Sequence, residues 1–262
     1  MGAQQRGAAP DQARQRVAAL GPFFAFETYP PQEPPAEPWR PMAELVQEPA
    51  VLRHRAEAVR AYLAAGGGRS PEELELRIGA SVAQLGLVAR LLSPALGFAA
   101  LYGRPLAVGL DALRWQPVLG GGFPLALPQQ ALQAALAGPE TDPESTARLL
   151  GAGLLDGPVR ALVEAAAGLS VSRQVLWGNV ASAVNGAAAA LAATAPGPVA
   201  ERARVLAAAL QRQPALRGAS SGPGVGRGFR RRSCCLIYRA APAAAARSGR
   251  SGLCGDCVLA GR

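Results

Sequence analysis

The four cysteines of this 262-residue chain are confined to one short stretch, between positions 234 and 257. Cysteines gathered this closely are typical of metal ligands. Half of the residues are hydrophobic, so the remainder of the chain can bury a substantial core. The sequence therefore predicts a packed body and a separate cysteine-bearing tail with a chemistry of its own.

The spacing of the cysteines narrows the kind of site. Cys254 and Cys257 are separated by two residues, and Gly255 keeps the turn between them open. Cys234 and Cys235 are adjacent, so their side chains point in different directions, which suits a cluster better than a single tetrahedral ion. Two such pairs supply the four thiolates of a 2Fe-2S cluster or of one zinc ion. The spacing favours the iron–sulfur cluster, with a zinc site and a redox disulfide as alternatives.

The predicted compartment is the cytoplasm. The first twenty residues are rich in charge and have no apolar segment of the kind found in secretion signals. The most apolar long window, residues 85–101, contains Arg90 and Pro94 and is short for a membrane span. Cytoplasmic thiols stay reduced, which favours metal ligation over disulfides.

The positive charge of the chain is concentrated in the tail. The net charge is +9, and residues 217–262 contain nine arginines and a single acidic residue. The tail offers few aromatic side chains, Phe229 and Tyr238, and the body has no basic face, so a nucleic-acid partner is not expected. We expect the arginines around the cysteines to offset the negative charge of a thiolate-bound cluster.

The fold class is predicted as mainly α with a small β element (α+β), a helical body followed by a short cysteine-rich segment. Apolar residues recur at helical spacing in most of the body. Ser70-Pro-Glu-Glu favours the start of one helix, and Pro94 is expected to end or kink it. The predicted helices cover residues 42–65, 70–92, 128–137, 143–154, 158–168, 172–193 and 198–212.

A change of periodicity marks the β element. Leu106, Val108 and Leu110 alternate with other residues, and a glycine run at 120–122 follows. This pattern predicts short strands around a glycine turn within residues 104–126.

Three segments follow from this organisation. Residues 1–41 contain many prolines and are predicted to form an extended arm. Residues 42–216 form the helical body with its β element near 104–126. Residues 217–262 comprise a Gly/Ser/Pro linker and the cluster-binding segment.

The tail resembles the C-terminal motif of FhuF-like ferric siderophore reductases, the (2Fe-2S)-binding ferric iron reductase family. The resemblance is carried by Arg-Arg-Ser-Cys-Cys-Leu-Ile-Tyr-Arg at 231–239 and Leu-Cys-Gly-Asp-Cys at 253–257. Two body segments resemble family segments less specifically: Ala-Ser-Val-Ala-Gln-Leu-Gly-Leu-Val-Ala-Arg at 80–90 and Leu-Trp-Gly-Asn-Val-Ala-Ser-Ala at 176–183.

The sequence departs from the family pattern in one place, because eighteen residues rather than about ten separate Cys235 from Cys254. A longer loop costs little closure entropy, so the ligands can still meet, but contacts made by the family's loop do not carry over to the insert at 240–247.

The resemblance implies an enzyme, a ferric siderophore reductase that reduces Fe(III) to Fe(II) to release iron in the cytoplasm. The implied cofactor is a 2Fe-2S cluster on Cys234, Cys235, Cys254 and Cys257, and no catalytic residue is expected beyond the cluster. The electron donor would be an external reductase or ferredoxin, and peripheral association with a siderophore importer is implied. Arg230, Arg231, Arg232 and Arg239 are predicted to bind the anionic ferric complex. The alternative is a zinc-stabilised helical scaffold without redox activity.

Other functional signals are weak. His54, the one histidine, lies between two arginines on a predicted helix and is expected on the surface. Trp115 and Trp177 are expected in the core. The glycine-rich segment at 222–228 follows no predicted strand and precedes no predicted helix, which argues against a dinucleotide site.

Overall fold

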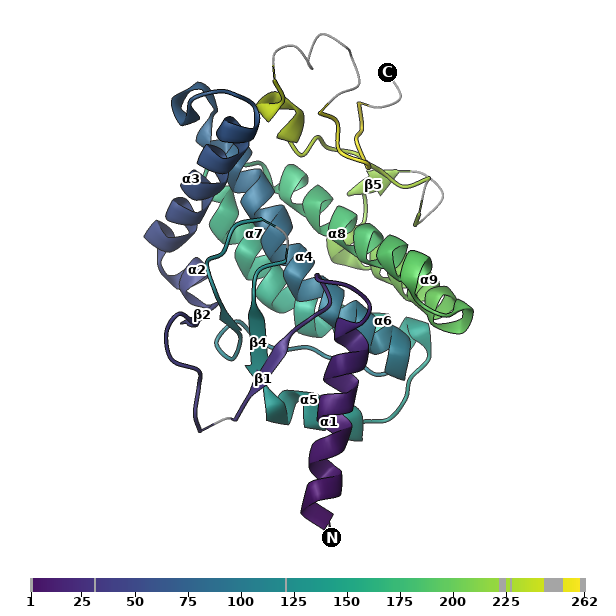
Figure 1. Cartoon of the computed structure of the whole chain (residues 1–262). Coiled ribbons are helices and arrows are strands. Elements are labelled where there is room, and N and C mark those ends of the chain that lie inside the picture. Colours follow the sequence, from purple (N-terminus) through teal and green to yellow (C-terminus); the bar gives the residue numbers. More distant parts are fainter. Residues whose placement is uncertain are drawn as a thin grey trace.

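A computed structural model describes residues 2–30, 32–120, 122–221, 225–226, 228–242 and 252–259 (Figure 1). The chain is mainly helical with a small mixed sheet, which confirms the predicted α+β class. The long helices form the centre of the molecule, the sheet and α1 lie toward one end, and the tail lies at the other (Figure 1).

Two apolar helices form the centre of the fold. Helix α4 (Leu76–Tyr102) and helix α8 (Arg173–Thr194) pack against each other and are flanked by α3 (Pro49–Gly66) and α9 (Gly197–Gln211). Most of α4 is buried on every side, because its residues are apolar around the whole circumference. Gly79 allows the close approach of α3, since a Cβ there would lie 2.3 Å from the carbonyl oxygen of Ala56.

Both central helices are also long and apolar enough to cross a membrane. In the described structure they are largely buried by protein, 72% of the most apolar window of α4 and 67% of that of α8. This burial is consistent with core helices of a soluble protein.

The helix predictions agree with the structure over most of the body. Helix α5 (Gln129–Ala137), α8 and α9 lie within a few residues of the predicted spans. The predicted helix at 42–65 is divided into α2 (Glu44–Gln47) and α3, because Glu48 is extended and Pro49 begins a new helix. His54 is exposed on α3, as predicted.

The predicted end of the 70–92 helix is wrong. Ser70 and Glu73 form a capped 3-10 turn, η1 (Pro71–Glu73), in which the Ser70 N–H donates to Glu73 Oε2 at 2.7 Å. Helix α4 begins only at Leu76 and continues past Pro94 to Tyr102. Pro94 is buried among apolar neighbours, and this packing compensates for the backbone hydrogen bond that proline removes.

The two helices predicted at 143–154 and 158–168 are joined across a kink. Helix α6 (Pro143–Leu150) is capped by Asp142, whose carboxylate accepts a hydrogen bond from the Ser145 N–H at 3.0 Å. A wider π-type segment, η2 (Gly151–Val159), follows and leads into α7 (Arg160–Ala167). Gly157 has non-helical dihedral angles within it, so the predicted break is present as a kink.

The β element differs from the prediction in its strands. The sheet has the order β1-β4-β3-β2, with β3 (Arg114–Trp115) antiparallel to β4 (Leu125–Pro128). Residues 104–110 do not form a strand. Their backbone is irregular, and the alternating apolar pattern arises because Leu106 and Leu110 are buried in the core.

Trp115 is buried, as predicted, and its indole N–H donates to Glu44 Oε1 at 2.9 Å. Trp177 is only partly buried against the core.

The expectation of an extended arm at 1–41 is also wrong. Residues Gly2–Ala18 form helix α1, and β1 (Glu27–Tyr29) and β2 (Arg40–Pro41) are edge strands of the sheet. Val17 and Phe24 are buried in the main core, so apolar burial anchors this segment despite its proline content.

Described residues at both ends of the segment predicted as a linker are paired or buried. Strand β5 (Ser220–Ser221) pairs with β6 (Arg230–Arg231), and Phe229 is buried in the main core. Much of 222–228 and of the insert at 240–247 lies outside the described residues.

Candidate metal centre

The structure brings the two halves of the cysteine motif together. The Sγ atoms of Cys235 and Cys254 lie 3.5 Å apart, although nineteen positions separate them in the sequence. Cys235 and Cys257 are buried, and Cys234 and Cys254 are partly exposed. All four thiols are free of disulfides.

Two of the four thiols are spaced like two ligands of one shared metal. Two thiolates bound to one tetrahedral metal at 2.3 Å lie about 3.8 Å apart, so the Cys235–Cys254 separation is close to that of a shared metal. Within the described residues, no group of three or more His, Cys, Asp or Glu side chains is already gathered at metal-binding distance. Metal binding commonly completes the ordering of such sites.

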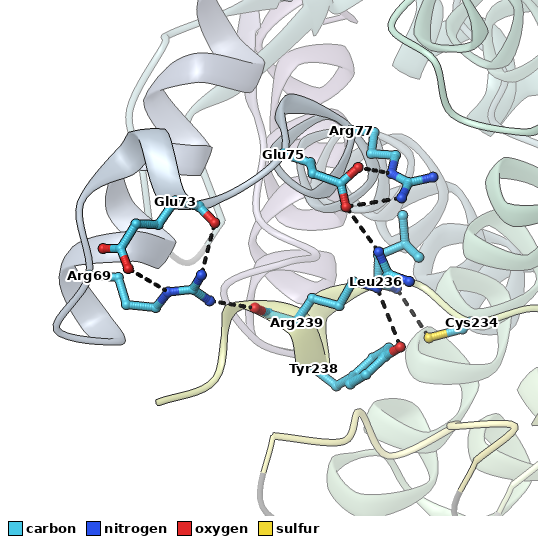
Figure 2. A network of polar contacts seen from close by, with 8 residues as sticks. All are labelled: Arg69, Glu73, Glu75, Arg77, Cys234, Leu236, Tyr238 and Arg239. Atoms are coloured by element: carbon cyan, nitrogen blue, oxygen red, sulfur yellow. Dashed lines mark hydrogen bonds and ion pairs between the residues drawn. The ribbon is translucent and has the colours of Figure 1, made fainter. Parts of the chain in front are cut away.

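Backbone amides are directed at two of the other sulfurs. The Leu236 N–H donates to Cys234 Sγ at 3.3 Å (Figure 2), and the Leu259 N–H donates to Cys257 Sγ at 3.4 Å. Leu236 adopts a left-handed backbone conformation with φ of 70°. Hydrogen bonds of this kind stabilise thiolates over thiols.

The thiols influence one another's pKa values. The hydrogen bond from the Cys254 thiol lowers the pKa of Cys235, against the effect of burial, and the Arg231 charge lowers it further. The same hydrogen bond, together with burial, raises the pKa of Cys254. Burial raises the pKa of Cys234.

A buried arginine lies beneath the cysteines. Arg231 is 2% exposed, and its guanidinium donates to Asn179 Oδ1 through Nη1 and to Ser182 Oγ through Nη2, the latter at 2.8 Å. Both acceptors are on α8. The Arg231 backbone N–H donates to the Asp256 carbonyl at 3.1 Å, so this one residue connects the two halves of the motif.

Asp256, between the last two cysteines, fastens its half of the motif to α8. Its carboxylate accepts hydrogen bonds from the Ser182 hydroxyl at 2.5 Å and from the Asn185 side-chain amide at 3.2 Å. The Asn185 side-chain oxygen in turn accepts from the Gly226 N–H at 2.6 Å. The side chains of α8 therefore hold the tail at three positions.

Helix α4 holds the other half of the motif. The Ser81 hydroxyl donates to the Cys235 carbonyl at 2.9 Å. The Asn179 amide donates to the Ser81 carbonyl and to Gln84 Oε1, both at 2.9 Å. These residues are fully buried, so the polar network connects the α4–α8 interface directly to the cysteines.

A second attachment lies at the junction of α3 and α4 (Figure 2). The tail forms a 3-10 turn, η4 (Ile237–Ala240), next to Cys234. Arg239 forms an ion pair with Glu75 at 2.9 Å, and Arg69 donates to the Arg239 carbonyl at 2.9 Å. A hydrogen bond from Arg77 lowers the pKa of Glu75, and the ion pair with Arg239 lowers it further.

The four arginines singled out from the sequence have different environments. Arg232 and Arg239 are exposed, Arg230 is partly buried, and Arg231 is buried in the network described above. The expectation that Arg231 contacts the ferric complex therefore needs correction, because its guanidinium is directed into the protein. Within β6, successive side chains point to opposite faces, which places Arg231 toward the protein and leaves Arg230 partly exposed.

Sequence reasoning missed the polar residues of the body that support the tail. Ser81, Gln84, Asn179 and Ser182 lie within the two segments, 80–90 and 176–183, that resemble family segments. A polar residue recurring within an otherwise apolar helix is the signal that would have identified them.

Replacing Asp256 by alanine is expected to loosen the tail. The substitution leaves the Ser182 and Asn185 donors without their acceptor, at a cost of about 1–3 kcal/mol. Trypsin should then cleave after Arg232 and Arg239 faster than in the parent protein. Asp156→Ala, which removes an exposed carboxylate paired with Arg160, is the matched control. Equal cleavage rates in the two variants would contradict this role of Asp256.

Comparison with known proteins does not assign a family. No protein-family model matches the chain, and no curated protein matches it.

Proposed function

We propose that this protein is a 2Fe-2S electron-transfer protein that reduces the Fe(III) of ferric siderophores in the cytoplasm. The observation that supports this proposal best is that the tail and the two body segments resembling the FhuF-like reductases lie in contact. Ser81 donates to the Cys235 carbonyl, and Asn179 and Ser182 bond Arg231 and Asp256, one in each half of the cysteine motif.

The residues around the cysteines favour a negatively charged group. Four thiolates with iron and sulfide carry net negative charge, and the site offers amide donors to two sulfurs together with the buried Arg231. When bound, the cluster would supply single electrons. Cys234, Cys235, Cys254 and Cys257 would hold it, and the network on α4 and α8 would fix their backbone.

The exposed arginines are placed to attract the substrate. Ferric complexes of catecholate and citrate type are anionic, and Arg232 and Arg239 are exposed on the tail, with Arg230 partly so. Surface charge of this kind mainly accelerates encounter and makes its rate depend on salt. The electron donor would be a separate reductase or ferredoxin.

Neutralising Arg232 should slow the reduction of anionic complexes alone. Arg239 also holds Glu75, so Arg232 gives the cleaner test. With chemically reduced protein and a ferrous chelator as reporter, Arg232→Gln should lower the rate for an anionic ferric complex about two- to fivefold at low salt. The rate for a neutral complex should stay unchanged.

The matched control is Arg53→Gln, which removes an exposed arginine from α3. Equal losses for anionic and neutral complexes would contradict the capture role. Failure of the reduced parent protein to form any Fe(II) from either complex would contradict the proposed reductase function.

A further inference from the structure

We propose that Arg231 sets the reduction potential of the cluster, as a fixed cation that Asn179 and Ser182 hold in place. This inference rests on the proposed iron–sulfur function and assigns a role to one residue of that site. It separates Arg231 from the neighbouring arginines, which are placed to act on the substrate.

The first argument is the cost of burying a charge. Arg231 is 2% exposed, and among the residues that the structure describes no carboxylate forms an ion pair with it. Asp256 reaches the guanidinium only through the Ser182 hydroxyl. A buried cation with neutral hydrogen-bond acceptors is unfavourable unless an anion lies close to it. A thiolate-bound cluster adds a second anion beside the Asp256 carboxylate, which reaches Arg231 only through Ser182.

The second argument is an unused donor. Arg231 Nε is buried and has no acceptor among the described residues, although both terminal nitrogens are bonded. Buried donors in native proteins nearly always have a partner. Sulfur atoms of a cluster accept such hydrogen bonds, and bonds of this kind raise reduction potentials.

The third argument is position. The Arg231 backbone is bonded to Asp256, between Cys254 and Cys257, and the side chain is bonded to Asn179, which contacts Ser81 below Cys235. The backbone and side-chain contacts of Arg231 therefore place it between the two halves of the cysteine motif.

The electrostatic consequence has a definite sign. Reduction adds one negative charge, and a cation held in a poorly screened interior stabilises that charge more than an exposed cation does. Removing Arg231 should therefore lower the potential, whereas removing Arg232, one residue away but exposed, should have little effect.

The experiment compares Arg231→Gln with Arg232→Gln, two variants with the same change in charge. Potentials are measured by dye-coupled titration of the holoprotein, after iron and sulfide analysis of each sample. We expect Arg231→Gln to lower the reduction potential of the cluster. At a fixed applied potential, the ratio of reduced to oxidised cluster should fall at least tenfold, which corresponds to 59 mV for one electron. Arg232→Gln should shift it less than threefold.

Equal shifts in the two variants, or no shift in Arg231→Gln, would overturn the inference. If Arg231→Gln does not retain the cluster, Arg231→Lys is compared with Arg232→Lys. Lysine keeps the charge but not the fixed hydrogen-bonding geometry, so a shift confined to Arg231→Lys supports the role and its absence refutes it. A parent protein without iron and sulfide would instead contradict the proposed function itself.

Discussion

Replacing Cys235 by serine should leave the protein with less than about a tenth of the iron and sulfide of the parent chain. Loss of a residue that only supports a ligand already lowers metal affinity 10–100-fold, and Cys235 is proposed as a ligand itself. The chain has no further cysteine to substitute for it. Iron and sulfide analysis with visible absorption after anaerobic purification measures the loss.

The same loss is expected for Cys234, Cys254 and Cys257, each replaced by serine. Arg232→Gln, which changes an exposed neighbour, should retain the full iron content. A cysteine variant that keeps the parent spectrum would show that this cysteine is not a ligand. Retention of the cluster in all four variants would refute the proposed site.

Replacing Arg90 by methionine should be the most destabilising change in the body. Arg90 is 2% exposed on α4 and donates to the carbonyls of Phe23, Ala25 and Phe123, at 2.5, 2.9 and 2.8 Å. Burial lowers its pKa to about 10, so the guanidinium remains charged at neutral pH. Each acceptor left unsatisfied costs about 1–3 kcal/mol, and we expect a loss of at least about 3 kcal/mol.

Urea unfolding followed by circular dichroism measures this effect. Arg53→Met, on the exposed face of α3, is the matched control and should change the free energy of unfolding by less than about 0.5 kcal/mol. Arg90→Lys should fall between the two, because one ammonium group cannot satisfy three separated carbonyls. Equal midpoints for Arg90→Met and Arg53→Met would contradict the role assigned to Arg90.

Local sequence signals predicted the helices well where apolar periodicity and capping agreed. Helices α5, α8 and α9 lie close to their predicted spans, and the fold class is confirmed. The errors occurred where tertiary packing outweighed local preference. Pro94 remains inside α4 because apolar neighbours surround it, and the proline-containing N-terminal segment is ordered because Val17 and Phe24 are buried.

The strand β1 could not be predicted from its own residues. Its partner β4 lies about a hundred positions further along the chain, and three residues carry too little pattern to indicate pairing. Arg90 illustrates the same limit, since the sequence marked it only as a charge that interrupts an apolar window. The three carbonyls that bind it come from two distant segments.

The candidate site was predicted in part. The cysteines were identified from their spacing, and the structure brings Cys235 and Cys254 within 3.5 Å. The supporting residues were not, because a serine or asparagine within an apolar helix has no fixed role until its partner is known. Arg231 is buried because its side chain reaches Asn179 and Ser182 on α8, a contact that a run of three arginines does not reveal.

The central claim is that the four cysteines hold a 2Fe-2S cluster. Anaerobic purification of the full chain, followed by visible spectroscopy and analysis of iron, sulfide and zinc, tests it most directly. The account predicts a red-brown protein that absorbs between about 400 and 600 nm, with two iron and two sulfide per chain. A colourless protein with one zinc per chain would contradict it and would favour a zinc-stabilised scaffold.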